Sequence, residues 1–326
     1  MRRLKKALAL ACMTLASLGS ASTALAQNFP SHQATIVVPY PPGGFNDTLA
    51  RILSQHLTQA WSQSVVVENR PGGNNLIGNQ YVARAKPDGY TYLITPLPFS
   101  ALPALYGAKL PYDAVRDFEP VIWAGSTQNI LTVRSDSSIK SVADLLAAAK
   151  KNPGKINFGS TGAGSSNHLS MELFMMMADV KLTHIPYKGS APAVSALLAG
   201  DIDVLFDNVP NVLPNIQAGK LRAVAVTGTK RTTQLPEVPT VAEAGVPGYE
   251  VTVWFGVQAP AGTPKDIVAR VNKDMAAVLR RPEVVKQVNE QGVEIVASTP
   301  EEFKQLVARE IPKWEKVVKA ANVSLE

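Results

Sequence analysis

The chain has 326 residues, a length that suggests two domains of ordinary size or one large domain. Hydrophobic residues make up 46% and charged residues 18%, which excludes intrinsic disorder. The single cysteine excludes a disulfide scaffold and any cysteine-based zinc or iron–sulfur site. The formal net charge is +6, and several of the basic residues lie at the very start of the chain.

Residues 1–26 have the three parts of a secretory signal peptide. A basic start is followed by an apolar run over about residues 7–18 and by small residues that end in Ala24-Leu25-Ala26. A membrane anchor would need about 20 consecutive apolar residues. A lipoprotein would need a better signal than Ala9-Leu10-Ala11 before Cys12. We therefore expect cleavage after Ala26 and export of the mature chain.

Cleavage changes the charge of the protein. The mature chain keeps 28 basic residues against 26 acidic ones, so it is nearly neutral. This balance removes the case for a nucleic-acid partner, and we expect none.

The mature chain alternates between expected strands and expected helices. Short apolar runs predict strands at residues 36–38, 65–67, 91–94, 130–133, 157–158, 182–185, 204–206 and 223–226. After the first strand, residues 47–61 carry apolar side chains at helical spacing, so we expect one face of this helix to be buried.

Capping patterns mark further helices. Ser141 and Thr240 each precede an acidic residue by three positions, and Pro264 and Pro300 stand near helix starts. This alternation favours an α/β protein with mostly parallel sheets, and the length favours two doubly wound lobes. In such folds ligands bind where the carboxyl ends of strands meet the amino ends of helices.

The first junction of this kind is the loop at residues 39–47, between the first strand and its helix. Gly43 and Gly44 let the backbone turn tightly and approach a ligand closely. Asn46 or Asp47 can cap the helix, and the free N–H groups beside them form an anion site. For Asp47 alone we favour an ordinary capping role, so the loop backbone is the better candidate for ligand binding.

The second junction is the loop at residues 159–168. Its three glycines and four hydroxyl groups offer many hydrogen-bond donors. Ser165 stands where a phosphate-binding loop needs lysine, and Asn167 replaces the third glycine of a dinucleotide-binding loop. This loop therefore favours a small carboxylate as its ligand.

A catalytic alternative rests on Ser165 and His168, which lie three positions apart at a helix start. The chain has neither a G-x-S-x-G elbow nor an H-E-x-x-H zinc motif, so we expect no enzyme, no metal and no cofactor. We expect His168 to form structural or ligand-facing hydrogen bonds. Asp207 follows the strand at residues 204–206 and either faces the cleft or caps a turn.

Short motifs follow one another in a fixed order over the mature chain. They are Val-Pro-x-x-Pro-Gly-Gly-x-x-Asp at residues 38–47, Glu-Asn-Arg-Pro-Gly-Gly at 68–73, Pro-Asp-Gly-Tyr-Thr at 87–91, Gly-Ser…His-Leu at 164–169, Pro-Tyr-Lys-Gly at 186–189, Phe-Asp-Asn at 206–208 and Leu-Pro-Glu-Val-Pro-Thr at 235–240. The series resembles the Bug, or TctC-like, receptors of tripartite tricarboxylate transporters. Each motif is weak alone, but the order and spacing are highly specific.

The resemblance implies a periplasmic solute-binding protein with two α/β lobes of the periplasmic-binding-protein type II kind and a cleft between them. It implies a discontinuous lobe 1 at residues 27–125 and 251–326 and a lobe 2 at residues 126–250. The implied ligand-binding residues are Gly43, Gly44, Phe45, Asn46, Asp47, Ser160, Thr161, Ser165, Ser166, His168 and Asp207.

The resemblance also implies partners. A small organic acid or related solute would be captured and delivered to the integral-membrane permease subunits of a tripartite transporter, and we expect the receptor to be a monomer. A periplasmic sensor subunit that signals to a histidine kinase is the alternative. A secreted hydrolase that uses Ser165 and His168 is a remote one.

Overall fold

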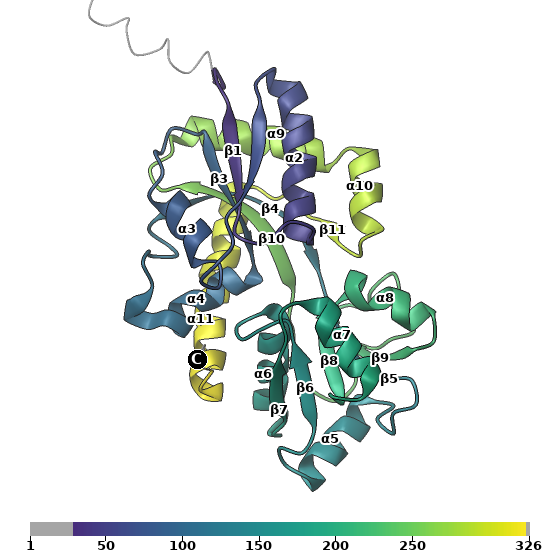
Figure 1. The fold of residues 1–326 in the computed structure, drawn as a ribbon. Helices are drawn as coiled ribbons and strands as arrows, with labels where there is room; N and C mark the ends of the chain where they lie inside the picture. Colours follow the sequence, from purple (N-terminus) through teal and green to yellow (C-terminus); the bar gives the residue numbers. More distant parts are fainter. Residues whose placement is uncertain (1–28, 324–326) are drawn as a thin grey trace, which may run out of the picture.

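The computed structural model describes residues 29–323, and the signal peptide predicted at residues 1–26 lies outside them. These residues form two β-sheets with helices around each, one in the upper and one in the lower part of Figure 1. The architecture is the two-lobed α/β fold that the sequence predicts. In the described part of the chain, no helix is both long and apolar enough to span a membrane.

The upper sheet has six strands in the order β11-β4-β10-β3-β1-β2. Its strands are β1 (Ala34–Val38), β2 (Val65–Asn69), β3 (Thr91–Pro96), β4 (Phe118–Thr127), β10 (Val253–Pro260) and β11 (Glu294–Ile295). The helices that belong to this part are α2 (Phe45–Trp61), α3 (Leu76–Ala83), α4 (Leu102–Tyr106), α9 (Lys265–Leu279) and α10 (Pro282–Asn289), with short 3-10 turns η2 (Leu97–Ala101) and η3 (Gly107–Lys109).

The lower sheet has five strands in the order β7-β6-β8-β5-β9. Its strands are β5 (Asn129–Arg134), β6 (Asn157–Ser160), β7 (Thr183–Pro186), β8 (Val204–Asn208) and β9 (Leu221–Val226). The helices around it are α5 (Val142–Lys151), α6 (Ser166–Ala178), α7 (Ser190–Ala199) and α8 (Val209–Gln217). The strands of the upper sheet thus come from residues 34–127 and 253–295, and those of the lower sheet from residues 129–226. The lobe limits themselves stay a prediction.

The sheets are mixed, although the sequence pattern favoured mostly parallel ones. Four of the strand pairings among the described residues are parallel and five are antiparallel. The register shows where the antiparallel pairs arise. Asn129, at the start of β5, lies opposite Asn208, at the end of β8, and Phe255 of β10 lies opposite Pro96, at the end of β3. β5 and β10 are the first strands after the chain passes from one sheet to the other. Each therefore begins at the edge of its sheet where its neighbour, β8 or β3, ends. Local periodicity does not report strand direction.

One predicted helix is absent. Thr240 and Glu243 do form the reciprocal capping bonds, from Glu243 N–H to Thr240 Oγ1 at 3.0 Å and from Thr240 N–H to the Glu243 carboxylate at 2.9 Å. The segment nevertheless remains a turn, since Gly245 follows with a φ of +123°. The long strands β4 and β10 were not predicted. By contrast, the cap at Ser141 and the helix start near Pro300 are confirmed.

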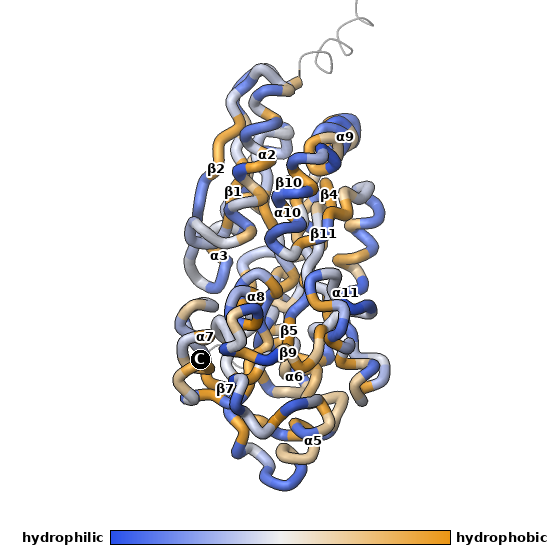
Figure 2. The backbone as a smooth tube through the Cα atoms, turned by 90° about the vertical axis from the view of Figure 1, so that its right-hand side faces the viewer, coloured by the Kyte–Doolittle hydropathy of each residue, from blue (hydrophilic) through white to orange (hydrophobic). Residues whose placement is uncertain are grey.

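Helix α11 (Pro300–Ala321) connects the two parts of the molecule. It packs against β4 of the upper sheet and against α6 beside the lower one, and Figure 1 shows it in yellow, running from the level of the upper sheet down to the level of α6. A single apolar cluster joins Val37 and Leu93 with Leu131, Phe158 and the fully buried Trp314. Figure 2 shows apolar residues gathered on the inner strands and polar residues on the outer faces of the helices. The two sheets thus share part of their core.

Candidate ligand-binding site

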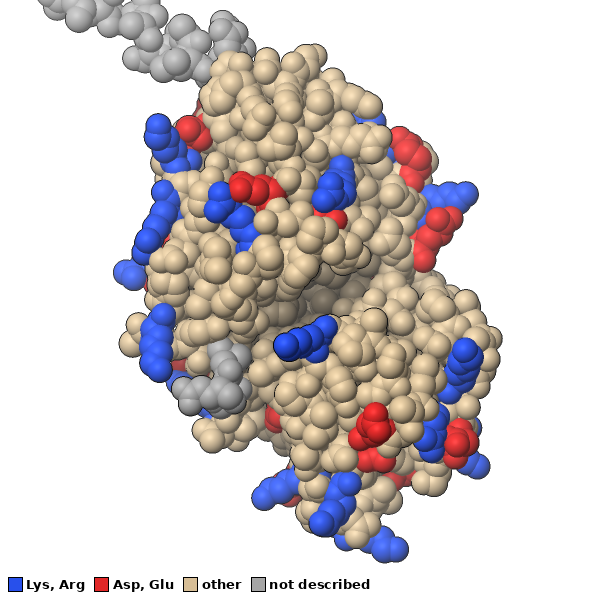
Figure 3. All heavy atoms as spheres, in the orientation of Figure 1, with Lys and Arg blue, Asp and Glu red and all other residues tan. Residues whose placement is uncertain are grey.

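A cavity of about 690 Å³ lies between the two sheets. Figure 3 shows a hollow at this level, between the upper and lower parts of the molecule. Both loops singled out in the sequence contribute to its wall, with Gly43, Gly44, Phe45 and Asn46 on the upper side and Thr161, Ser165 and Ser166 on the lower side. The fold therefore brings together two loops that are more than 100 residues apart in the chain.

The amino ends of four helices meet at this cavity. Phe45, Ser166 and Ser190 are the first residues of α2, α6 and α7, and Asn208, the N-cap of α8, lines the same wall. The first N–H groups of a helix lack partners within it and carry a partial positive charge. At α8, however, Val209 N–H donates to Gln128 O and Pro210 has no N–H, so the free donors come from α2, α6 and α7. Among the described lining residues Lys188 is the only charged one, and none is acidic. This arrangement favours an anionic ligand.

Asp47 holds the first loop from behind. The N-cap of α2 is Gly44, and Asp47 lies one turn into the helix, 5% exposed. Its carboxylate accepts hydrogen bonds from Gly43 N–H at 3.2 Å, Asn69 Nδ2 at 3.0 Å and Arg51 Nε at 2.9 Å. The bond from Arg51 is the largest of the effects that lower the pKa of Asp47. Asp47 is not among the lining residues, and it fixes Gly43, whose φ is +99°.

An apolar wall faces the donors. The rings of Phe45 and Phe255 lie 4.6 Å apart between centroids and are tilted by 55°. Val253, Val293 and prolines of the β3–α4 segment continue this wall. Next to it, the buried Oδ1 of Asn46 has no hydrogen-bond partner among the described residues. The cavity therefore suits a solute that combines a charged end with an apolar section.

Ser160 and His168 lie behind the second loop, on the side away from the cavity wall. Both side chains are buried, and neither residue is among the lining residues. Ser165 is the N-cap of α6 and accepts a hydrogen bond from His168 N–H at 3.3 Å. Thr161 Oγ1 donates to Asn167 Oδ1 at 2.8 Å. Several polar side chains of the loop are thus hydrogen-bonded within the loop itself, and the first N–H groups of α6 remain available to a ligand.

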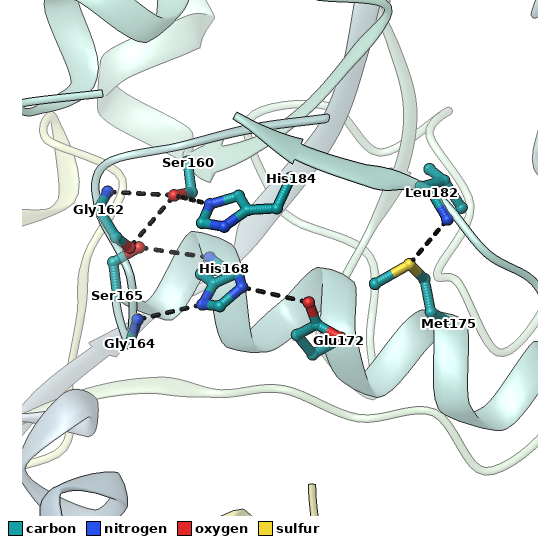
Figure 4. Close-up of polar contacts among 9 residues, drawn as sticks. All are labelled: Ser160, Gly162, Gly164, Ser165, His168, Glu172, Met175, Leu182 and His184. Carbon is teal, nitrogen blue, oxygen red and sulfur yellow. Dashed lines mark hydrogen bonds and ion pairs between the residues drawn. The ribbon is translucent and has the colours of Figure 1, made fainter. Parts of the chain in front are cut away.

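His168 and Ser165 do not form a nucleophile–base pair. The imidazole Nδ1 accepts from Gly164 N–H at 3.1 Å, and Nε2 lies 3.2 Å from Glu172 Oε1 (Figure 4). Both ring nitrogens are therefore engaged elsewhere. A general base has to reach the proton that it abstracts, so the hydrolase alternative is wrong.

Asp207 lies under the cavity floor and is fully buried. It accepts hydrogen bonds from Asn167 Nδ2 and Asn211 Nδ2, each at 2.9 Å, from Asn208 N–H at 2.7 Å and from Ser190 Oγ. Burial raises the pKa of this carboxyl, and the four hydrogen bonds oppose the effect. Asp207 is not itself a lining residue, but all four donors belong to residues that are. Its contact with a ligand stays a prediction.

Several lining residues were not predicted as ligand-binding residues from the sequence, although Lys188 and Asn208 stand in the family motifs. They are Lys188, Ser190, Asn208, Asn211 and Phe255. A usable pattern was present for the first two, because Tyr187-Lys188-Gly189 stands between a strand and a helix, as the two glycine-rich loops do. The others lie on elements whose orientation depends on packing between distant parts of the chain.

Two sheets linked by crossing strands, with a donor-rich cavity between them, define a solute-binding receptor. The chain matches the model of the tripartite tricarboxylate transporter family receptor, TctC, over residues 49–323, and it belongs to that family. The resemblance seen in the sequence is thereby confirmed. Members of this family are periplasmic binding proteins and not enzymes.

Curated relatives agree with this assignment. The chain is 42% identical over 291 residues to a UPF0065 protein from the tcbD–tcbE intergenic region of Pseudomonas sp. strain P51, covering 89% of this chain and 86% of that protein. It is 35% identical to BugT of Bordetella pertussis, with 96% of each chain covered.

Solved structures agree as well. R. palustris Rpa4515 with adipate has 40% sequence identity and a TM-score of 0.81, covering 91% of this chain and 99% of that one. MatC from Rhodopseudomonas palustris with bound malate has 31% identity and a TM-score of 0.78, covering 89% and 100%. Adipate and malate are both carboxylates, which supports carboxylate binding in this group of receptors.

Proposed function

We propose that this protein captures a small carboxylate in the cavity between its two sheets and delivers it to the membrane permease of a tripartite tricarboxylate-type transporter. The main support for this proposal is the cavity wall, where the amino ends of four helices meet beside Lys188. None of the described lining residues is acidic. The carboxylates bound by similar receptors support this class of solute.

The available donors are sufficient for useful affinity. A hydrogen bond to a charged group contributes about 1.5–3 kcal/mol, so four of them give roughly 6–12 kcal/mol before ordering costs. A micromolar dissociation constant corresponds to about 8 kcal/mol. Backbone N–H groups at helix ends therefore suffice without an arginine clamp.

The location of this step follows from the family and the amino-terminal sequence. We place the protein in the periplasm after removal of residues 1–26, whose basic start and apolar run fit an export signal. Periplasmic binding proteins close around their ligands by hinge motion. Closure would change the surface that meets the permease, which provides a means of signalling that the cavity is filled.

Calorimetric titration of the chain from residue 27 onward, freed of co-purified ligand by unfolding and refolding, tests solute capture. The panel is succinate, malate, adipate and benzoate, with adipamide as the matched uncharged control. We expect saturable binding of at least one carboxylate and none of adipamide. Ligand-free protein that binds no carboxylate would contradict the proposal. Uptake of the bound carboxylate by cells with and without the gene then tests delivery.

A further inference from the structure

Two stacked imidazoles lie directly behind the loop of the lower sheet that faces the cavity. The rings of His168, on α6, and His184, on β7, have centroids 3.9 Å apart and an interplanar angle of 14°. Phe158 stacks on His184 with ring centroids 4.8 Å apart, and His168 is only 3% exposed. Neither histidine belongs to the lining residues of the cavity. The pair therefore contacts the loop and not the solute.

The hydrogen bonds of His168 allow one protonation state. Gly164 N–H can only donate, so the Nδ1 atom that accepts from it at 3.1 Å carries no proton. The ring proton is then on Nε2, which lies 3.2 Å from Glu172 Oε1. Glu172 and the stacked ring of His184 thus fix the tautomer and the orientation of an imidazole whose acceptor atom points at the loop.

His184 contacts the same loop at Ser160, four residues before Gly164 in the chain. Ser160 Oγ lies 3.1 Å from both the carbonyl and the N–H of Gly162 and 2.6 Å from His184 Nε2. The short contact between Ser160 Oγ and His184 Nε2 ties the second imidazole to the start of the loop. Burial and the neighbouring His168 lower the pKa of His184 to about 3, which keeps this ring neutral as well.

These contacts determine which way the loop presents its amides. Gly162 and Gly164 have φ values of +127° and +76°, so the chain turns twice within three residues. The Gly164 amide is directed backward onto His168, and Ser165 then begins α6. The N–H groups of Ser166 and Asn167, in the first turn of α6, have no acceptor among the described residues, and both residues line the cavity.

We propose that His168 is a positioning residue for solute capture: its neutral imidazole anchors the Gly164 amide and thereby aims the amino end of α6 at the ligand. This inference rests on the proposed function, since it concerns the same cavity. Without the acceptor, the buried Gly164 amide loses its partner and the loop has to turn to find another one.

Two variants at one position separate anchoring from simple packing. His168→Leu keeps the volume and removes the acceptor. His168→Asn places Oδ1, also bonded to Cγ, near the position of the imidazole Nδ1. We expect His168→Leu to weaken carboxylate binding roughly tenfold or more and His168→Asn to restore it to within about threefold of the wild type. Leu173→Ala, five residues further along α6, is the control and should lower the unfolding temperature without changing affinity.

Calorimetric titration with adipate and malate gives the affinities, and amide hydrogen exchange at Gly164 follows the anchored bond itself. We expect fast exchange in His168→Leu and protection in His168→Asn. If the leucine variant does not fold, Glu172→Leu replaces it, because that change frees the ring from its orienting partner and should expose the Gly164 amide.

Each outcome decides between explanations. Wild-type affinity in the leucine variant, equal losses in the leucine and asparagine variants, or an equal loss in Leu173→Ala would overturn the positioning role. A wild-type protein that binds no carboxylate refutes the proposed function instead, and the positioning role with it.

Discussion

Lys188 gives the cavity wall its positive charge. Among the described lining residues it alone is charged, and its side chain is exposed. We expect Lys188→Met to weaken carboxylate binding about 3- to 10-fold, less than a buried charged bond would, because water and salt screen an exposed ammonium. The loss should shrink as salt is added.

Titration calorimetry at low and high salt measures this effect. Lys181→Met is the matched control, since Lys181 is also exposed but precedes β7, whereas Lys188 follows it. An equal loss of affinity in both variants would show that net charge alone, and not the position of Lys188, attracts the solute.

His184 makes the stability of the fold depend on pH. Its pKa falls from 6.5 in the unfolded chain to about 3 in the folded one, because burial and His168 disfavour the charged ring. The unfolded chain therefore binds more protons between these values. The contribution to the free energy of unfolding is fully present above pH 6.5 and is lost progressively as the pH falls toward 3.

Urea unfolding between pH 4 and pH 7 checks the sign. We expect His184→Phe, which keeps an aromatic ring next to His168 but cannot titrate, to show a shallower loss of stability over this range. An unchanged slope in that variant would assign the acid sensitivity to other groups.

At the scale of elements, the contact between β10 and α11 sets how closely the long central strand can approach the last helix. A Cβ placed on Gly256 would overlap the ring of Phe303, which is fully buried. We expect Gly256→Ala to lower the free energy of unfolding by about 1–3 kcal/mol, the usual cost of overpacking a core. The double variant Gly256→Ala/Phe303→Leu should recover part of this loss in denaturant titrations, because leucine leaves room for the added methyl group. If the double variant is as unstable as Gly256→Ala alone, the loss of stability comes from strain within β10 and not from the contact with Phe303.

At the scale of the whole molecule, the shared core predicts cooperative unfolding. Leu93 of the upper sheet, Phe158 of the lower sheet and Trp314 of α11 belong to one apolar cluster. We expect a single calorimetric transition for the ligand-free chain, since part of the core of each sheet lies in this shared cluster. Trp314→Ala should lower the free energy of unfolding by about 3–5 kcal/mol and leave the transition single. Two separated transitions in the wild type would contradict this coupling.

The sequence predicts those helices whose formation depends on residues close together in the chain. Helical spacing and capping predicted α2, α5 and α11, because both depend on neighbours within one or two turns. The capping pattern at Thr240 failed, since a cap satisfies amides but does not prevent Gly245 from ending the segment as a turn. The antiparallel pairings of β5 and β10 depend on where the chain crosses between sheets, which no local pattern reports.

By itself the sequence determined the alternation of strands and helices and the two glycine-rich junctions, because each is a property of adjacent residues; the export signal at residues 1–26 stays a prediction. Only the tertiary structure decided which of the predicted side chains line the cavity. It places Asp47, Ser160, His168 and Asp207 behind the wall as anchors and brings Lys188 into the wall itself. The physical reason is that the direction of a side chain at a strand–helix junction is set by hydrogen bonds from residues far along the chain, such as Asn69 to Asp47 and Asn167 to Asp207.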